Sequence, residues 1–275
     1  MTNKRNLNVA KWLVGSAMVL VGSSAMADWN FGSNSLTGTP TGTSITSVAT
    51  GLSTTGSGST FATATATPYG GNGLGVTAQG EATGSPDHSV DNVGSTDAVL
   101  LSFNSSVVLT GVTSGWTWRD GAAPGTAAAA SDSDISVLRY IGSATTAAAV
   151  TTATVGKTVQ QLTAVGGGWT LVSQLANLVT GANTSTGDTT LGSSWWLISA
   201  YNSGYTSVAT TTSSAANLLD NGNDYFKVLA VAGVATPTNS SKVPEPGSLA
   251  LMGAGLLGLL VSRRKTKAKA FDLTA

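Results

Sequence analysis

Short runs of alternating apolar side chains, separated by tracts of Gly, Ser, Thr and Ala, constrain this fold more than any other feature. In DAVLLSFNSSVVLTGVTSGWTW (97–118), the apolar residues Val99, Leu101 and Phe103 recur at every second position. Residues with period two share one face of a strand. The polar stretch Asn104 to Ser106 interrupts the run, which is typical of a hairpin turn. The segment therefore predicts an antiparallel hairpin.

Further runs with β-branched or aromatic enrichment predict more strands. They are DISVLRYIG (134–142), SSWWLISAY (193–201) and DYFKVLAVAG (224–233). The Thr-rich tracts at 37–67, 143–154 and 206–217 predict short strands and exposed loops rather than helices.

One segment differs. GGGWTLVSQLANLVTG (166–181) places Trp169, Val172, Leu175 and Val179 near helical spacing, which predicts a short amphipathic helix. The fold class is therefore all-β, a β-sandwich with a jelly roll as one form of it, and with one short helix.

The chain contains no cysteine, so disulfides and thiolate metal sites are excluded and stability must come from packing. Its formal net charge is zero, but the basic residues gather at both ends and the stretch between them is acidic. Binding to nucleic acid needs clustered Lys and Arg on the folded domain. We therefore expect no nucleic-acid partner.

Residues 1–27 have the composition of a secretory signal peptide. Lys4, Arg5 and Lys11 form a positive start, an apolar stretch follows, and Ala25-Met26-Ala27 is an A-x-A cleavage site. We expect the Sec translocon to export the chain and the mature protein to begin at Asp28.

The other end combines a proline motif, an apolar run and a basic tail. Val243, Pro244, Glu245 and Pro246 precede the apolar residues 247–262, which as a helix would span about 24 Å, against about 30 Å of membrane hydrocarbon. Arg263, Arg264 and Lys265 follow and can reach the headgroups from the cytoplasmic side. This predicts a transmembrane helix with the preceding domain outside the inner membrane.

VPEPGSLALMGAGLLGLLVSRRK closely resembles the PEP-CTERM sorting signal of exported bacterial proteins. The resemblance implies that an exosortase, an integral membrane enzyme, recognises residues 243–275 and removes the tail. It also implies an inner-membrane-anchored intermediate of a Gram-negative bacterium, delivered to the cell surface or extracellular matrix. The exported β-rich domain is then 28–242. A plain single-pass anchor is the alternative.

The domain also resembles a group of exosortase-dependent surface proteins, which implies a location but no reaction. The matching stretches are WNFG (29–32), SPDHSVDN (85–92), DSDISVLRY (132–140), GWTLV (168–172), SSWWLISAYN (193–202) and NDYFKVLAV (223–231).

Candidate catalytic residues are few. His88 is the only histidine and no G-x-S-x-G motif occurs, so we expect a protein that is not an enzyme. A hydrolase that uses His88 or paired Asp residues remains an alternative.

Calcium prefers carboxylate and carbonyl oxygens in turns. We expect no cofactor other than a structural calcium ion with Asp132 and Asp134 as ligands. Asp87 with Asp91, and Asp220 with Asp224, are alternative pairs.

Aromatic rings can stack against the apolar faces of sugars. Trp116 and Trp118 are therefore candidate sugar-binding residues, whereas Trp195 and Trp196 point to opposite sides of a strand and at least one belongs to the core. The leading functional hypothesis is a structural or adhesive protein of an exopolysaccharide or biofilm. The alternative is a secreted carbohydrate-binding module.

Overall fold

The computed structural model describes residues 26–55, 59–119, 133–187, 190–206, 211–212, 219 and 224–236. The chain divides into two compact units, Met1–Ala235 and Thr236–Ala275. All described residues except Thr236 belong to the first unit. Most of the predicted signal peptide and the whole predicted sorting signal lie outside the described residues. Within the described part, no helix is long and apolar enough to cross a membrane.

The first unit is built from strands, which confirms the all-β class. Its described strands form one 13-stranded sheet. The strands are β1 (Met26–Asn30), β2 (Thr37–Thr41), β3 (Ser47–Thr54), β4 (Phe61–Pro68), β5 (Leu74–Thr77), β6 (Val90–Asp91), β7 (Asp97–Arg119), β8 (Ile135–Tyr140), β9 (Trp169–Leu175), β10 (Asn183–Ser185), β11 (Ser193–Ala200), β12 (Thr211–Thr212) and β13 (Asp224–Ala235). The helical elements are η1 (Gly70–Asn72), α1 (Ala147–Thr154) and α2 (Val159–Thr163).

The long strand β7 organises this sheet. Its first part, Asp97–Phe103, pairs with β3, and residues from Ala98 to Ser102 pair with β11 on the other side. Its second part, Val107–Arg119, pairs with β13. The hydrogen-bonded ladder runs from β1 through β2, β3, β7 and β13 back to β1, so each of these strands has a neighbour on both sides.

The hairpin predicted at Asn104 to Ser106 is wrong, because β7 continues through these residues. The polar side chains have partners outside the strand: the Asn104 side chain accepts a hydrogen bond from the Thr46 amide at 3.0 Å, and the Asn104 amide donates to the Thr46 carbonyl at 3.1 Å. The polar interruption therefore marks the place where β7 exchanges its partners β3 and β11 for β13.

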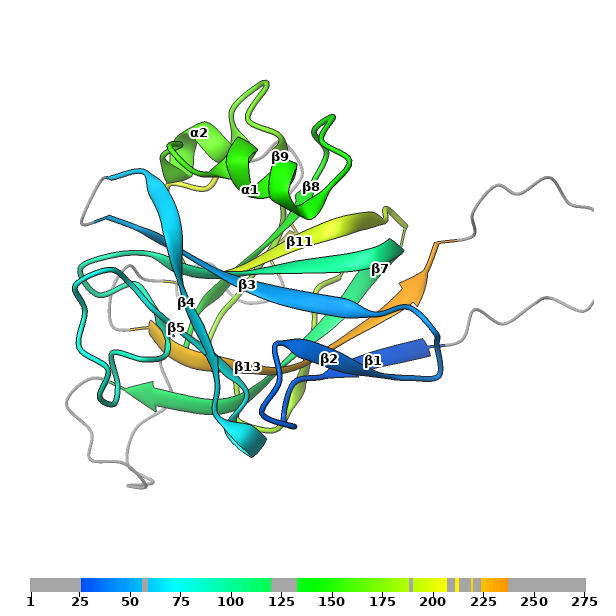
Figure 1. Ribbon diagram of the computed structural model, residues 1–275, viewed down its shortest axis with the longest axis horizontal. Helices are drawn as coiled ribbons and strands as arrows, with labels where there is room; N and C mark the ends of the chain where they lie inside the picture. Colours follow the sequence, from blue (N-terminus) through cyan, green and yellow to red (C-terminus); the bar gives the residue numbers. More distant parts are fainter. Residues whose placement is uncertain are drawn as a thin grey trace, which may run out of the picture. The chain divides into compact units, whose positions relative to one another are not determined.

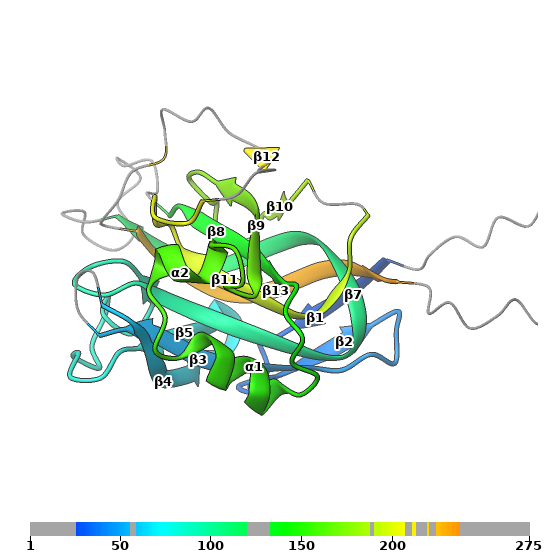
Figure 2. The same ribbon diagram turned by 90° about the horizontal axis from the view of Figure 1, so that it is seen from above.

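Two apolar clusters lie on opposite faces of β7. One contains Trp29, Leu101, Phe103 and Val231, in which the Trp29 and Phe103 rings meet edge to face with centroids 4.8 Å apart. The other contains Leu100 together with residues of α1, α2, β8 and β9. Figure 1 shows both helices on one side of β3, β7 and β11, with β1, β2 and β13 on the other side. Figure 2 gives the view from above, in which α1 and α2 lie in front of these strands.

The Ala- and Thr-rich tract at 143–154 forms α1, so the prediction of strand and loop there is wrong. The Thr146 side chain caps the helix by accepting a hydrogen bond from the Ala149 amide at 3.2 Å, and alanine is the best helix former. Val150 and Thr154, four residues apart, are buried on one face. A second short helix, α2, begins with a capping box formed by Thr158 and Gln161.

The helix predicted at 166–181 is also wrong, because this segment contains strand β9. Its side chains alternate between buried and half-buried from Trp169 to Leu175, and Val179, expected on the apolar face, is 62% exposed. The strands predicted at 134–142, 193–201 and 224–233 are confirmed as β8, β11 and β13. The tract at 37–67 supplies β2, β3 and β4, as predicted.

Candidate functional site

Three carboxylates from separate segments meet beside the start of β7. They belong to Glu81 in the loop after β5, Asp91 in β6 and Asp97 at the first position of β7, and one oxygen of each lies within 4.8 Å of the others. Strand pairing fixes two of them, since Asp91 lies opposite Tyr225 of β13 and Asp97 opposite Ser53 of β3. We call these three residues the carboxylate cluster.

Burial leaves three oxygens of this cluster without partners among the described residues. Asp91 is 1% exposed and Asp97 is fully buried, whereas Glu81 is half-buried. The Ala78 amide donates to Glu81 Oε2 at 2.7 Å, and the Val93 amide donates to Asp91 Oδ1 at 3.0 Å. Asp91 Oδ2 and both carboxylate oxygens of Asp97 have no hydrogen-bond partner among the described residues.

The environment of the cluster disfavours the charged form of each acid. Desolvation raises the pKa of Asp91 to about 9, and the charge of Asp97 adds to this effect. Desolvation also raises the pKa of Asp97 well above its usual range. The Ser53 hydroxyl, the Asp91 amide and the Ser95 hydroxyl oppose this rise, although none of them is in hydrogen-bonding geometry with Asp97. The pKa of Glu81 is raised by burial as well. The cluster therefore favours the uptake of protons or of a cation.

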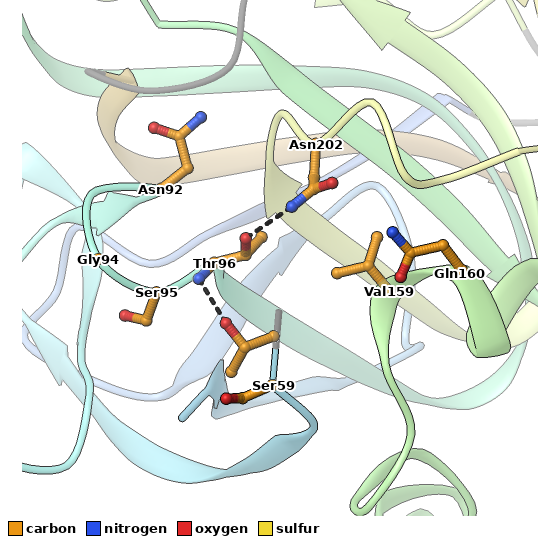
Figure 3. Close-up of a pocket in the computed structure, with 9 residues that line it drawn as sticks. Ser59, Asn92, Gly94, Ser95, Thr96, Val159, Gln160 and Asn202 are labelled. Atoms are coloured by element: carbon orange, nitrogen blue, oxygen red, sulfur yellow. Dashed lines mark hydrogen bonds between the residues drawn. The ribbon is translucent and has the colours of Figure 1, made fainter. Parts of the chain in front are cut away.

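A polar pocket of about 270 Å³ lies next to this cluster (Figure 3). Uncharged side chains and one glycine line it: Thr54, Ser59, Asn92, Gly94, Ser95, Thr96, Val159, Gln160 and Asn202. They come from the end of β3, the loop before β4, the segment before β7, α2 and the residues just after β11. The chemistry of this lining suits a neutral ligand with many hydroxyl groups.

Hydrogen bonds hold much of the pocket wall in place. Figure 3 shows the Asn202 amide donating to Thr96 Oγ1 at 2.9 Å, while the Thr96 backbone amide donates to Thr54 Oγ1 at 2.7 Å. Asn92 Nδ2 donates to the Asp224 carboxylate at 2.6 Å. The side chains of Ser59 and Gln160 have no such bond among the described residues, so they can bind a ligand.

The predicted sugar-binding residues Trp116 and Trp118 are neighbours on one face of β7. Their rings meet edge to face with centroids 5.7 Å apart, and both side chains are half-buried. The Lys227 ammonium lies 3.6 Å from the centroid of the Trp116 ring and therefore covers one face of it. Sugar binding by these two residues stays a prediction.

The predicted calcium ligands Asp132 and Asp134 are not part of the carboxylate cluster. Asp132 lies outside the described residues. Asp134 is buried, its Oδ1 accepts a hydrogen bond from the Asn177 amide at 2.7 Å, and its own amide donates to Asp224 Oδ1 at 2.6 Å. A calcium ion held by this pair stays a prediction. Of the residues in the alternative pairs, Asp91 belongs to the cluster, whereas Asp87 and Asp224 do not. Asp220 lies outside the described residues.

His88 takes part in packing. Its ring lies 4.5 Å from the Tyr69 ring, centroid to centroid, and its buried Nδ1 has no hydrogen-bond partner among the described residues. In a Ser-His-Asp site, a hydrogen bond from Nδ1 of the histidine to the aspartate orients the catalytic base. The arrangement gives no support to the hydrolase alternative.

Residues 242–265 match the family model of the PEP-CTERM protein-sorting motif. The chain carries a PEP-CTERM sorting motif. The match covers Val243 to Pro246 and the basic residues Arg263 to Lys265, all outside the described residues. No curated protein and no solved structure matches the chain.

The PEP-CTERM motif implies an exported protein that an exosortase processes and that is anchored in a membrane before it is directed to the surface. The predicted signal cleavage lies at the other end. Ala25 lies outside the described residues, whereas Ala27 pairs with Gly233 and Asp28 with Ala232 at the start of β1. Cleavage before Asp28 stays a prediction.

Proposed function

We propose that this chain is a non-enzymatic protein of the cell surface or extracellular matrix of a Gram-negative bacterium. Its role is structural or adhesive, within an exopolysaccharide or biofilm. The observation that carries the proposal is the PEP-CTERM motif at residues 242–265, because that motif implies exosortase-dependent export. The Sec translocon exports the chain, the C-terminal helix holds it briefly in the inner membrane, and processing near Pro246 releases the exported domain.

The scaffold of this surface protein is, we infer, a β-sandwich related to the jelly roll. Support comes from β7, which passes from the partners β3 and β11 to the partner β13 and so connects two parts of the sheet. In sandwich folds, strands that bend from one sheet to the other form such corners. The apolar cluster around Trp29 and Phe103 then fills the space between the two sheets.

The polar pocket supports a polysaccharide as the partner. Its lining is uncharged and offers amide and hydroxyl groups, which match the donors and acceptors of a sugar. Among the described residues, the side chains of Ser59 and Gln160 make no hydrogen bond within the protein, so they supply groups for a ligand. A neutral or weakly charged glycan segment is therefore the ligand class that this pocket fits.

Binding to polysaccharide isolated from the native host tests this role. Gln160→Ala should weaken binding about tenfold, because it removes a side chain with two donors and one acceptor from the pocket. Gln79→Ala is the matched control, since Gln79 is exposed and outside this pocket. Equal binding by both variants and the wild type would contradict the pocket as the binding site.

The carbohydrate-binding module remains the second candidate function, and the paired rings of Trp116 and Trp118 are the observation that favours it. Trp118→Ala should abolish glycan binding if these rings form the platform, whereas Gln160→Ala should then have no effect. The two variants thus separate a pocket-based adhesive role from a Trp-based module.

Sorting itself is tested by replacing both prolines of the motif. Cells that express the Pro244→Ala, Pro246→Ala double variant should retain the protein in the inner-membrane fraction. The control Pro40→Ala changes a proline in β2 of the exported domain and should leave the surface fraction unchanged. Surface delivery of the double variant at the wild-type level would argue against exosortase processing.

A further inference from the structure

We propose that Glu81, Asp91 and Asp97 bind one Ca²⁺ ion, which fixes the segment between β5 and β7. The geometry supports a single ion. One oxygen of each carboxylate lies within 4.8 Å of the other two. Calcium binds oxygen at about 2.4 Å, so two ligands on opposite sides of the ion are about 4.8 Å apart. An ion among these three oxygens can therefore contact all of them.

Asp97 provides a second and independent indication of a ligand. Its side chain is fully buried, it belongs to the cluster, and neither of its oxygens has a hydrogen-bond partner among the described residues. Buried polar atoms are almost always satisfied, and an unpaired buried charge is costly. Asp91 Oδ2 lacks a partner too. A bound cation would satisfy all of these oxygens at once.

Nearby cations of the protein do not take this role. Lys227 is close enough for the charge of Asp91 to raise its pKa, but its ammonium lies against the Trp116 ring, 3.6 Å from the centroid. The charges of Asp97, Glu81 and Asp87 instead add to the desolvation that raises the pKa of Asp91, and the charge of Asp87 adds to the raised pKa of Glu81. The cluster is therefore a concentration of negative charge that the described side chains do not neutralise.

The chemistry of the donors selects the kind of ion. All three are carboxylates, and the chain has no cysteine, so a hard cation fits better than zinc or copper. Calcium takes six to eight ligands in flexible geometry, and backbone carbonyls and waters commonly supply the remainder. A surface pocket of about 430 Å³ reaches Glu81 and is lined also by Gln79, Gly80 and Ser95. It gives the ion and its waters a path from solvent.

The proposed ion also bears on the polar pocket. Glu81 and Asp91 lie within residues 81–96, and Asp97 follows this segment directly. The same segment supplies Asn92, Gly94, Ser95 and Thr96 to the wall of the polar pocket. Gly94 and Ser95 line both the polar pocket and the pocket beside Glu81. Calcium would therefore order one wall of the polar pocket.

Calorimetry on the protein purified from its host and stripped with EGTA tests the site directly. CaCl₂ should bind with one ion per chain and a Kd of about 1 mM or tighter, the range of extracellular modules. Saturating calcium should raise the Tm by about 2–6 °C and slow amide hydrogen exchange in residues 78–96. MgCl₂ should bind at least about tenfold more weakly, because magnesium demands a stricter octahedral geometry.

Variants show whether the binding belongs to this cluster. Glu81→Gln, at a half-buried position, and Asp97→Asn should each weaken calcium binding by about tenfold or more. Asp28→Asn is the control, because Asp28 is an exposed acid in β1. In EGTA, Asp97→Asn should be at least as stable as the wild type, because Asn is uncharged and replaces a buried acid whose charged form has no partner among the described residues. This result would also show that the variant folds.

Other outcomes would overturn the proposal. A folded wild type that binds no calcium up to about 10 mM, well beyond the ~1 mM limit of extracellular sites, has no such site. Wild-type affinity in both Glu81→Gln and Asp97→Asn would place any calcium elsewhere. Equal affinity for magnesium would exclude a calcium-selective site.

Discussion

The Lys227 ammonium lies 3.6 Å from the centroid of the Trp116 ring, while the side chain as a whole is only 2% exposed. Desolvation lowers the pKa of Lys227 to about 8, and the charge of Asp91 opposes the shift. A cation held over an aromatic face is partly compensated, but it has lost most of its water. The contact between the Lys227 ammonium and the Trp116 ring therefore stabilises the fold, whereas desolvation of the charged ammonium destabilises it, and this second effect depends on pH.

The desolvation of Lys227 predicts how the free energy of unfolding depends on pH. Between about pH 8 and pH 10.5 the unfolded chain binds a proton at Lys227 that the folded chain has released, so this residue makes stability rise with pH. The rise should amount to about 1–3 kcal/mol. Urea unfolding of the wild type and of Lys227→Met across this pH interval measures the rise in stability. The raised pKa of Asp91 makes stability fall with pH, so the difference between the two proteins gives the contribution of Lys227.

Lys157→Met is the control for the pH experiment, because the Lys157 ammonium donates to the Gly167 carbonyl at 2.8 Å and has a different environment. Comparison with this variant separates the loss of any lysine from the loss of the buried Lys227. If Lys227→Met keeps the wild-type pH dependence, burial of Lys227 does not shift its pKa.

The two adjacent tryptophans of β11 should differ strongly in their contribution to stability. Trp196 is fully buried and its Nε1 donates to the Val107 and Ser193 carbonyls, both at 3.1 Å. Trp196→Ala should lower the free energy of unfolding by about 3–5 kcal/mol. Trp195 is half-buried and lies edge to face with Tyr140, so Trp195→Ala should cost about 1–2 kcal/mol. Equal losses in chemical denaturation would mean that the two side chains are not on opposite faces.

Gly75 in β5 should not tolerate a side chain. A Cβ at this position would collide with the His88 carbonyl oxygen, which belongs to the segment that carries the carboxylate cluster. Gly75→Ala should therefore lower stability by about 3 kcal/mol, by displacing this segment. Gly71→Ala is the matched control, because nothing lies within 4 Å of its added Cβ. Thermal unfolding of the two variants measures the difference, and similar Tm values would contradict the close packing of β5 against this segment.

The strands were the most predictable part of the fold. β8, β11 and β13 are rich in β-branched and aromatic residues, which pack into the apolar clusters: β8 and β11 contribute to both clusters and β13 to the one around Trp29. The sequence did not distinguish helix from strand in two segments, those that form β9 and α1. In β9, Trp169 and Leu175 belong both to a helical series that runs through Val172 and to an alternation with period two, and pairing with β8 decides between them. In α1, the Thr146 cap and the Ala residues favour a helix, although threonine on average favours strands.

The carboxylate cluster could not be predicted from spacing. Its members are separated by loops of different length and fit no known calcium motif. The one signal was Glu81, the only glutamate outside the sorting motif. Pairing of Asp91 with β13 and of Asp97 with β3 brings the acids together, and such long-range contacts are absent from local sequence patterns. The PEP-CTERM motif, in contrast, is local and was read from the sequence directly.

Intact-mass and terminal-peptide mass spectrometry tests exosortase processing most directly. The protein is recovered from the extracellular fraction of its native host and, for comparison, from a strain without the exosortase. The account predicts a wild-type form that begins at Asp28, ends near Pro246 and lacks Arg263 to Ala275, and a longer form in the mutant strain. A mature wild-type protein that keeps the basic tail would contradict exosortase processing and leave a plain membrane anchor in its place.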